Sequence, residues 1–86
     1  MKIQLLISQW CPTCPAAEAL WSKAAAQEGM QLEVLDVAET AGRRVVVEAG
    51  ARTVPALIID GTLRAVGSSS ISQARALLKE ALGRQE

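Results

Sequence analysis

The chain has 86 residues and is half hydrophobic, a size and composition that predict one domain over residues 1–86 with a modest core. Nine basic and nine acidic side chains leave no formal net charge, so we expect no electrostatic binding to nucleic acid or to an anionic membrane. Histidine is missing, and no apolar run approaches the ~20 residues that span a bilayer, which excludes imidazole catalysis, imidazole metal ligands and a membrane-spanning helix.

The first part of the chain predicts a strand, a helix and a second strand. Residues 2–8 read as a β-strand, with Ile3, Leu5 and Ile7 on one face and Leu6 on the other. Residues 12–28 carry apolar side chains three and four positions apart, which is typical of an amphipathic helix, and Gly29 is a favourable stop. Residues 32–37 read as the second strand. Because a helix connects them, the two strands should pair in parallel.

The next segment predicts a helix followed by a hairpin. Residues 40–49 form an amphipathic stretch that ends at a glycine, although three consecutive valines lower its helix propensity. Residues 56–60 are an apolar run suited to a buried strand. The dipeptide Asp60-Gly61 is a strong signal for a two-residue turn, and residues 62–66 supply the partner strand.

A last helix is predicted from a capping signal. Ser70 and Gln73 are spaced as in a capping box, apolar side chains follow at helical spacing, and Gly83 ends the pattern. The element order is therefore βαβ-αββα. This order predicts an α/β fold with a four-stranded mixed sheet, and helices on both faces, because the first and third strands are apolar on both sides.

Two cysteines, Cys11 and Cys14, lie between the first strand and the first helix, and they are the only cysteines of the chain. The N-terminus lacks the features of a secretory signal peptide, so we expect the reducing cytoplasm. In the cytoplasm, a closely spaced cysteine pair is more often catalytic, redox-sensing or metal-binding than a permanent structural disulfide. Zinc would need four ligands and hence a second chain, and a structural disulfide across so small a loop would add little stability.

Three segments and the order of the elements carry a resemblance to a known family. They are Trp10-Cys11-Pro12-Thr13-Cys14, residues 49–57 with Thr53-Val54-Pro55, and Val66-Gly67. On these segments, which with the element order cover nearly the whole chain, the sequence resembles the thioredoxin fold in its minimal, glutaredoxin-sized form. The small glutaredoxin-like thioredoxins of prokaryotes are the subfamily that it is most similar to.

The sequence departs from the two best-known branches of this family at three places. Thioredoxins carry a buried aspartate six positions before the first cysteine, where this chain has Leu5. Glutaredoxins have tyrosine at the position of Thr13. They also have a Gly-Gly pair followed by an aspartate that helps to hold glutathione, where this chain reads Gly67-Ser68-Ser69-Ser70.

The turn itself predicts how the first thiol is activated. If Cys11 caps the helix, Pro12 takes the first helical position, and the N–H groups of Thr13 and Cys14 point at the sulfur and stabilise a thiolate. No basic residue adjoins Cys11, so we expect the backbone to supply most of this effect. Pro15 has no N–H, which predicts a loosened first turn with regular hydrogen bonds from the next residue onward.

The two thiols then divide the work. We expect Cys11 to attack a substrate disulfide and Cys14, one turn further and pointing inward, to resolve the mixed disulfide. No histidine is present, and Leu5 cannot accept a proton, so we expect the proton of Cys14 to pass to water or to the departing thiolate.

The resemblance implies the rest of the site. The Val54–Pro55 bond would be cis and lie against the cysteine pair, leaving the Val54 N–H and C=O free to bind an extended substrate segment. The expected rim of the groove is made by Trp10, Pro12, Thr13, Arg52 and Gly67.

Several simpler interpretations stay open. Trp10 could only shield the end of the strand, Pro55 could be an ordinary strand-starting proline, and Trp21 falls on the apolar stripe of the helix and is expected in the core.

The preferred hypothesis is a monomeric cytoplasmic dithiol–disulfide oxidoreductase without a bound cofactor. Its substrates would be disulfide-containing proteins, and its electrons would come from a reductase or a low-molecular-weight thiol. The alternatives are a small carrier that binds a soft metal or metalloid with the thiolates of Cys11 and Cys14, and a redox-inactive binding module.

Overall fold

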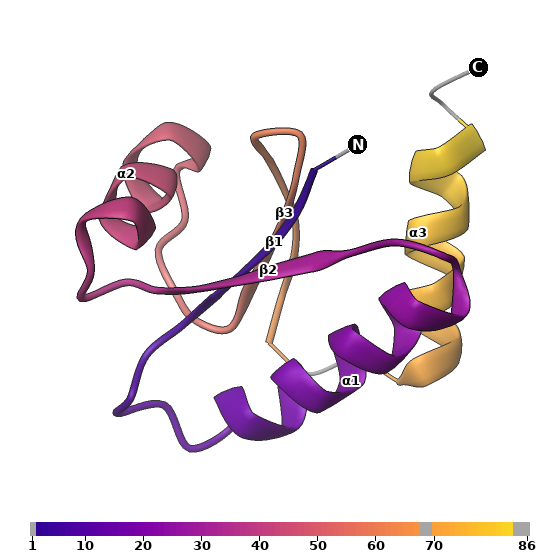
Figure 1. Ribbon diagram of the computed structural model, residues 1–86. Coiled ribbons are helices and arrows are strands. Elements are labelled where there is room, and N and C mark those ends of the chain that lie inside the picture. Colours follow the sequence, from indigo (N-terminus) through magenta and orange to yellow (C-terminus); the bar gives the residue numbers. More distant parts are fainter. Residues whose placement is uncertain (1, 68–69, 84–86) are drawn as a thin grey trace.

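A four-stranded mixed sheet forms the centre of the computed structural model, with strand order β2-β1-β3-β4 (Figure 1). The structure describes residues 2–67 and 70–83. The predicted fold class is confirmed, since three helices and four strands follow one another in the expected order. The elements are β1 (Ile3–Ile7), α1 (Cys14–Gln27), β2 (Leu32–Asp36), α2 (Thr40–Ala49), β3 (Ala56–Ile59), β4 (Thr62–Val66) and α3 (Ile71–Gly83).

Strand β1 lies inside the sheet and pairs with two partners. It runs parallel to β2, with Ile3 opposite Leu32 and Ile7 opposite Asp36. It runs antiparallel to β3, which in turn pairs antiparallel with β4. The parallel pair follows from the connecting helix α1, and the antiparallel pair β3–β4 follows from a tight turn.

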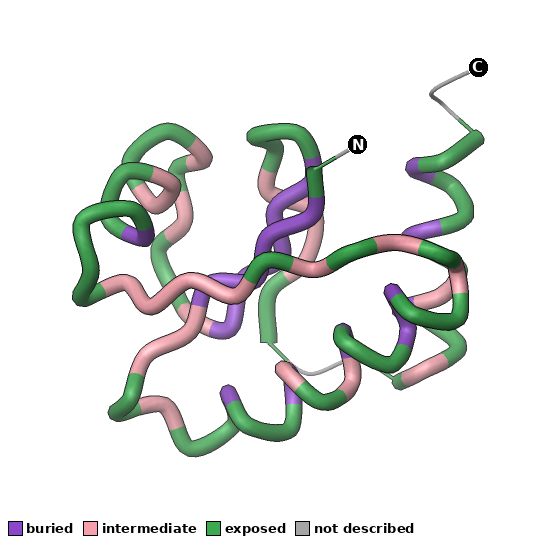
Figure 2. Tube along the Cα trace, viewed as in Figure 1, coloured by how far each residue is buried: buried purple, intermediate pink, exposed green. Residues whose placement is uncertain are grey.

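The helices cover both faces of the sheet, as Figure 1 shows, with α1 and α3 on one face and α2 on the other. Residues that alternate along β1 therefore enter different cores. Leu5 packs under α1 and α3 together with Trp21, whereas Leu6 belongs to a smaller cluster under α2. The buried segments of Figure 2 follow the same central strands. Trp21 is 2% exposed and is a core residue, as the helical spacing predicted.

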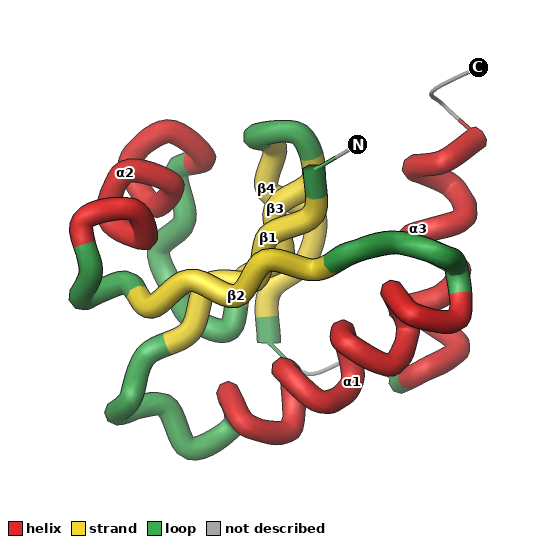
Figure 3. The backbone as a smooth tube through the Cα atoms, in the orientation of Figure 1, coloured by secondary structure: helices red, strands yellow, loops and turns green. Residues whose placement is uncertain are grey.

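Helix α1 begins later than the sequence predicted, at Cys14 and not at residue 12 (Figure 3). Thr13 is the capping residue, so the expectations that Cys11 caps the helix and that Pro12 takes the first helical position are wrong. The reason is Pro15, which occupies the second helical position and has no N–H to donate to the carbonyl of Cys11.

The first turn before α1 is held by a different set of bonds. The Cys14 amide donates to the Cys11 carbonyl over 3.4 Å, and the Ala17 amide donates to the Thr13 carbonyl over 3.1 Å. The prediction of a loosened first turn of α1 is thus confirmed. The regular bond lies one residue later than expected, at Ala17.

Helix α2 forms over the predicted residues 40–49 and ends at Gly50, which has a left-handed φ of 70°. The side chains of Val45, Val46 and Ala49 are half-buried against the smaller core cluster. Packing of this stripe on the sheet therefore outweighs the low helix propensity of the valines. Val47 lies on the outer side and is 80% exposed.

The turn between β3 and β4 has the geometry that its residues favour. Asp60 and Gly61 both have positive φ angles, 49° and 82°, as a tight turn of type I′ requires. The predicted capping box at the start of α3 is also present. The Ser70 hydroxyl accepts from the Gln73 amide over 3.2 Å, and the Gln73 side chain accepts from the Ser70 amide over 3.1 Å. Ser68 and Ser69 lie outside the described residues.

Replacing Ser70 by alanine is expected to cost about 1 kcal/mol of folding free energy, because it leaves the Gln73 amide without its acceptor. Urea unfolding followed by circular dichroism measures this change. Ser22→Ala, on the exposed side of α1, is the matched control and should be neutral or slightly stabilising. Equal stability of the two variants would contradict a capping role for Ser70.

Candidate active site

The loop between β1 and α1 carries Cys11 at its tip. The Cys11 amide donates to the Ser8 carbonyl over 3.1 Å, and the Trp10 amide donates to the Ser8 hydroxyl over 3.3 Å. These bonds fold the loop back on the end of β1. Both thiols are free, Cys11 is half-buried, and Cys14 is only 2% exposed. One sulfur therefore faces the surface and the other lies beneath it.

The sulfur of Cys11 makes two hydrogen-bonding contacts. It lies 3.4 Å from the hydroxyl of Thr13, and its thiol donates to the carbonyl of Val54 over 3.7 Å. The thiol of Cys14 also acts on this sulfur, because it is the largest of the causes that lower the pKa of Cys11. The two cysteines are thus close enough to interact directly.

These contacts lower the pKa of the Cys11 thiol below its ordinary value. The largest cause is the hydrogen bond with Cys14, followed by that with the Thr13 hydroxyl, and the backbone amides of Thr13 and Cys14 contribute less. The expectation that the backbone supplies most of the effect is therefore wrong. Because the helix begins at Cys14, Cys11 precedes the capping position and its sulfur depends mainly on side-chain donors.

Burial raises the pKa of the Cys14 thiol, and its hydrogen bond to Cys11 raises this pKa further. A buried thiolate lacks hydration, so the charged form is disfavoured. The two neighbouring thiols consequently differ, because Cys11 releases its proton more easily and Cys14 holds its proton more firmly.

The loop before β3 closes the site from the opposite side. The Val54–Pro55 peptide bond is cis, and the side chain of Pro55 is fully buried. The Gly67 amide donates to the Pro55 carbonyl over 2.9 Å, which joins the end of β4 to this loop. The structure thus brings Cys11, Val54, Pro55 and Gly67 together from three separate segments.

The predicted rim residues lie at the surface. Trp10 is 84% exposed, which contradicts the simpler interpretation that it shields the end of the strand. Pro12, Thr13 and Arg52 are exposed as well. A large exposed aromatic side chain beside a reactive sulfur offers contact area to another molecule.

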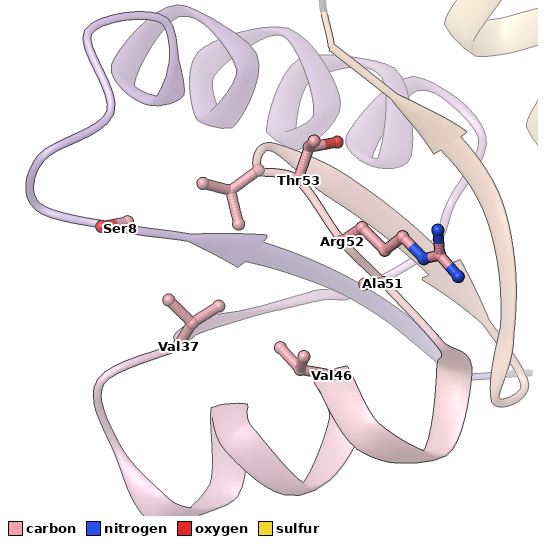
Figure 4. Close-up of a pocket in the computed structure, with 7 residues that line it drawn as sticks. Ser8, Val37, Val46, Ala51, Arg52 and Thr53 are labelled. Atoms are coloured by element: carbon pink, nitrogen blue, oxygen red, sulfur yellow. The ribbon is translucent and has the colours of Figure 1, made fainter.

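A pocket of about 260 Å³ flanks this loop on the α2 side (Figure 4). Figure 4 shows Val37 and Val46 pointing from below toward the loop that carries Thr53, while Arg52 extends away from Ser8. Val37 and Val46 were not predicted as site residues, because only the tertiary packing of α2 brings them beside the site. The lining residues are Ser8, Val37, Val46, Ala51, Arg52, Thr53 and Val54.

The described part of the chain holds no cluster of metal ligands and no membrane-spanning helix. Within residues 2–67 and 70–83, no three or more histidine, cysteine, aspartate or glutamate side chains gather as metal ligands would. None of the helices in that part of the chain combines the length and the apolar character needed to cross a bilayer.

A protein family and several known proteins resemble this chain. The family model described as a thioredoxin domain matches residues 1–79. The chain belongs to the thioredoxin domain family. Within this family it is 33% identical over 86 residues to a "Probable Thioredoxin" of Archaeoglobus fulgidus, an alignment that covers 100% of the chain and 94% of the relative. A "Probable Thioredoxin" of Methanothermobacter thermautotrophicus is 31% identical over 70 residues, which cover 81% of the chain and 82% of that protein.

A solved thioredoxin has the same architecture. Thioredoxin 1 from Thermosipho africanus TCF52B superposes with a TM-score of 0.76 and 25% sequence identity, over 99% of this chain and 98% of that one. The thioredoxin family membership and the shared fold together support a thiol–disulfide oxidoreductase in general.

Replacing Thr13 by valine is expected to raise the pKa of Cys11, because the hydroxyl that hydrogen-bonds to the sulfur is lost. The thiolate fraction at neutral pH should fall about two- to fivefold, measured by ultraviolet absorbance of the thiolate during titration. Thr62→Val, an equal change at an exposed site in β4, should leave the titration unaltered. An unchanged curve for Thr13→Val would contradict the role of this hydroxyl.

Proposed function

We propose that the protein is a dithiol–disulfide oxidoreductase in which Cys11 is the nucleophile and Cys14 is the resolving thiol. The observation that carries this proposal is the difference between the two thiols. Cys11 is partly exposed and its pKa is lowered, whereas Cys14 is buried and its pKa is raised. A nucleophile that must meet a substrate needs the first set of properties, and a thiol that acts only inside the site tolerates the second.

The reaction proceeds in two exchanges. The Cys11 thiolate attacks one sulfur of a substrate disulfide, and the other substrate sulfur leaves as a thiolate and takes a proton. Cys14 then gives up its proton, and its sulfur attacks Cys11 to form the Cys11–Cys14 disulfide while the second substrate thiol departs. The substrate gains two electrons from the protein and two protons, one released by Cys14 and one from water, into which Cys11 released its proton when it ionised.

Substrate binding fits an extended protein segment laid across the site. The Val54 carbonyl lies beside the attacking sulfur, and the apolar pocket with Val37 and Val46 flanks it. Trp10 offers apolar surface on the outer side, where the exposed Pro12, Thr13 and Gly67 complete the rim. Backbone pairing along Val54 would accept many sequences, which suits a reductase of disulfide-containing proteins.

The proposal extends to the setting of the reaction. No bound cofactor is required, because the two thiols hold the electrons themselves, and a reductase or a low-molecular-weight thiol must restore them. We propose a monomer that acts in the cytoplasm, where such donors keep thiols reduced. A soft-metal carrier would depend on the two thiolates alone, since no group of three or more histidine, cysteine, aspartate or glutamate side chains that could hold a metal ion lies in the described part of the chain.

A trapping experiment tests the division of labour. The Cys14→Ser variant, mixed with a peptide that contains one intramolecular disulfide, should accumulate a covalent adduct through Cys11 that mass spectrometry detects and dithiothreitol removes. The variant Cys11→Ser/Cys14→Ser is the matched control and should form none. An adduct on Cys14 in the Cys11→Ser variant, together with no adduct on Cys11 in the Cys14→Ser variant, would overturn the assignment.

A further inference from the structure

The resolving thiol has a carboxylate neighbour that the sequence analysis did not anticipate. Leu5 stands where thioredoxins carry a buried aspartate, so β1 supplies no acid to Cys14. Strand β2 does supply one. Asp36, its last residue, pairs with Ile7 at the end of β1, and the following Val37 amide donates to the Ile7 carbonyl over 2.9 Å.

The alternation along β2 determines the face on which Asp36 lies. Leu35 and Val37 pack in the cluster under α2, whereas Leu32 packs in the cluster under α1 and α3. Because successive side chains of a strand point to opposite faces, Asp36 lies on the face that α1 covers. Its partner Ile7 packs against that same cluster.

Asp36 also lies at the end of the sheet from which the chain leads into α1. Cys14 is the first residue of α1, and the loop before it folds back on the end of β1 through the bond from the Cys11 amide to the Ser8 carbonyl. Asp36 thus lies on the face of the sheet that α1 covers, at the end where α1 begins with Cys14. Register and alternation therefore place the carboxylate and the buried thiol on the same face and at the same end of the sheet.

The carboxylate is held in place by the turn that follows β2. One oxygen of Asp36 accepts from the Ala38 amide over 2.8 Å, and its carbonyl accepts from the Glu39 amide over 3.0 Å. The side chain is half-buried, so it is less screened by water than a surface acid. Its effect on the thiol is electrostatic. Burial raises the pKa of Cys14 most, the hydrogen bond with Cys11 and the charge of Cys11 raise it further, and the charge of Asp36 adds a smaller contribution in the same direction.

We propose that Asp36 is a positioning residue whose charge keeps the proton on Cys14 and thereby sets the pace of the resolving step. The inference rests on the proposed function and deepens it. In the mixed disulfide, Cys14 must release its proton to solvent before its sulfur bonds to Cys11 and the bond from Cys11 to the substrate breaks. A neighbouring negative charge opposes this ionisation. It therefore prolongs the mixed disulfide, and in the reduced protein it reserves the role of nucleophile for Cys11.

The first test measures the thiol without any turnover. In a Cys11→Ser background, Cys14 is the only cysteine, and its titration is followed by thiolate absorbance with and without Asp36→Asn. Asparagine keeps an oxygen for the Ala38 amide but removes the charge. The thiolate fraction of Cys14 below its midpoint should rise about three- to tenfold. An unchanged or smaller thiolate fraction would overturn the inference, and because no substrate is involved, this result is independent of the proposed function.

The second test measures resolution itself. Cys11 is loaded with one thionitrobenzoate group from dithiobis(nitrobenzoate), and release of the coloured thiolate reports attack by Cys14. A more acidic thiol is also a weaker nucleophile, so Asp36→Asn should accelerate release only about two- to fourfold at neutral pH. Slower release would overturn the inference and would make Asp36 a proton acceptor for Cys14.

Two matched variants remove the same charge from adjoining elements. Glu18 lies one turn beyond Cys14 on α1, and Glu39 is the capping residue of α2. Glu18→Gln and Glu39→Gln should leave both the titration and the release rate unchanged. If either variant reproduced the effect of Asp36→Asn, the cause would be net charge and not the placement of Asp36, and the inference would fail.

Discussion

Replacing Cys11 by serine is expected to lower the rate of protein disulfide reduction by about a thousandfold or more. The reason is that a hydroxyl is not ionised near neutral pH and cannot form a mixed disulfide, and Cys14, at 2% exposure, cannot meet a substrate in its place. The measurement is reduction of insulin with dithiothreitol as the electron source, with the uncatalysed rate subtracted.

The Cys14→Ser variant is the comparison for this loss. It keeps the nucleophile and should still complete the first exchange, so it loses turnover but retains a stoichiometric burst of released thiol. Circular dichroism of both variants shows whether each is folded. A Cys11→Ser protein that is folded and retains more than about a tenth of the activity would contradict the assigned nucleophile.

Replacing Gly42 by alanine is expected to destabilise the fold by about 3 kcal/mol or more, the largest effect that we expect of any single methyl group in this chain. Gly42 is buried in α2, and a Cβ placed on it would overlap the backbone carbonyl of Asp36 at the end of β2. Backbone atoms cannot turn aside as a flexible side chain can. The gain of about 1 kcal/mol in helix propensity from alanine is too small to offset this overlap.

Gly83 offers the matched control. It lies in α3, and a Cβ there would meet no atom within 4 Å, so Gly83→Ala should be neutral or stabilise by up to about 1 kcal/mol. Urea unfolding of the two variants side by side gives the comparison. A loss of less than about 1 kcal/mol in Gly42→Ala would contradict the close approach of α2 to β2.

The fold could be predicted from the sequence because its signals are local. Asp60-Gly61 requires no tertiary information to form a tight turn, and Ser70 with Gln73 forms its capping box within one helical turn. Apolar side chains on both sides of the first and third strands indicated that both faces of the sheet are covered. The start of α1 was predicted wrongly because the cysteine motif suggested a cap at Cys11, whereas Pro15 delays the regular hydrogen bonds.

The candidate site was predictable only where a motif spans it. The cysteine pair and the Pro55 loop were found through their order and spacing, and the structure brings them together. Val37, Val46 and Asp36 were missed because they carry no motif, and only the pairing of β2 with β1 and the packing of α2 bring them to the site. The dominant cause of the lowered pKa of Cys11 was also missed, since it depends on the side-chain position of Cys14.

The account depends on unequal ionisation of two neighbouring thiols, and alkylation of the reduced wild-type protein measures this directly. Iodoacetamide is added over a range of pH values, and mass spectrometry of the digested protein assigns each modification to Cys11 or Cys14. We predict that Cys11 is alkylated first, with a midpoint below that of an ordinary thiol, while Cys14 stays unmodified. Equal modification of the two cysteines, or a Cys11 midpoint at or above that of a free thiol, would contradict the proposed mechanism.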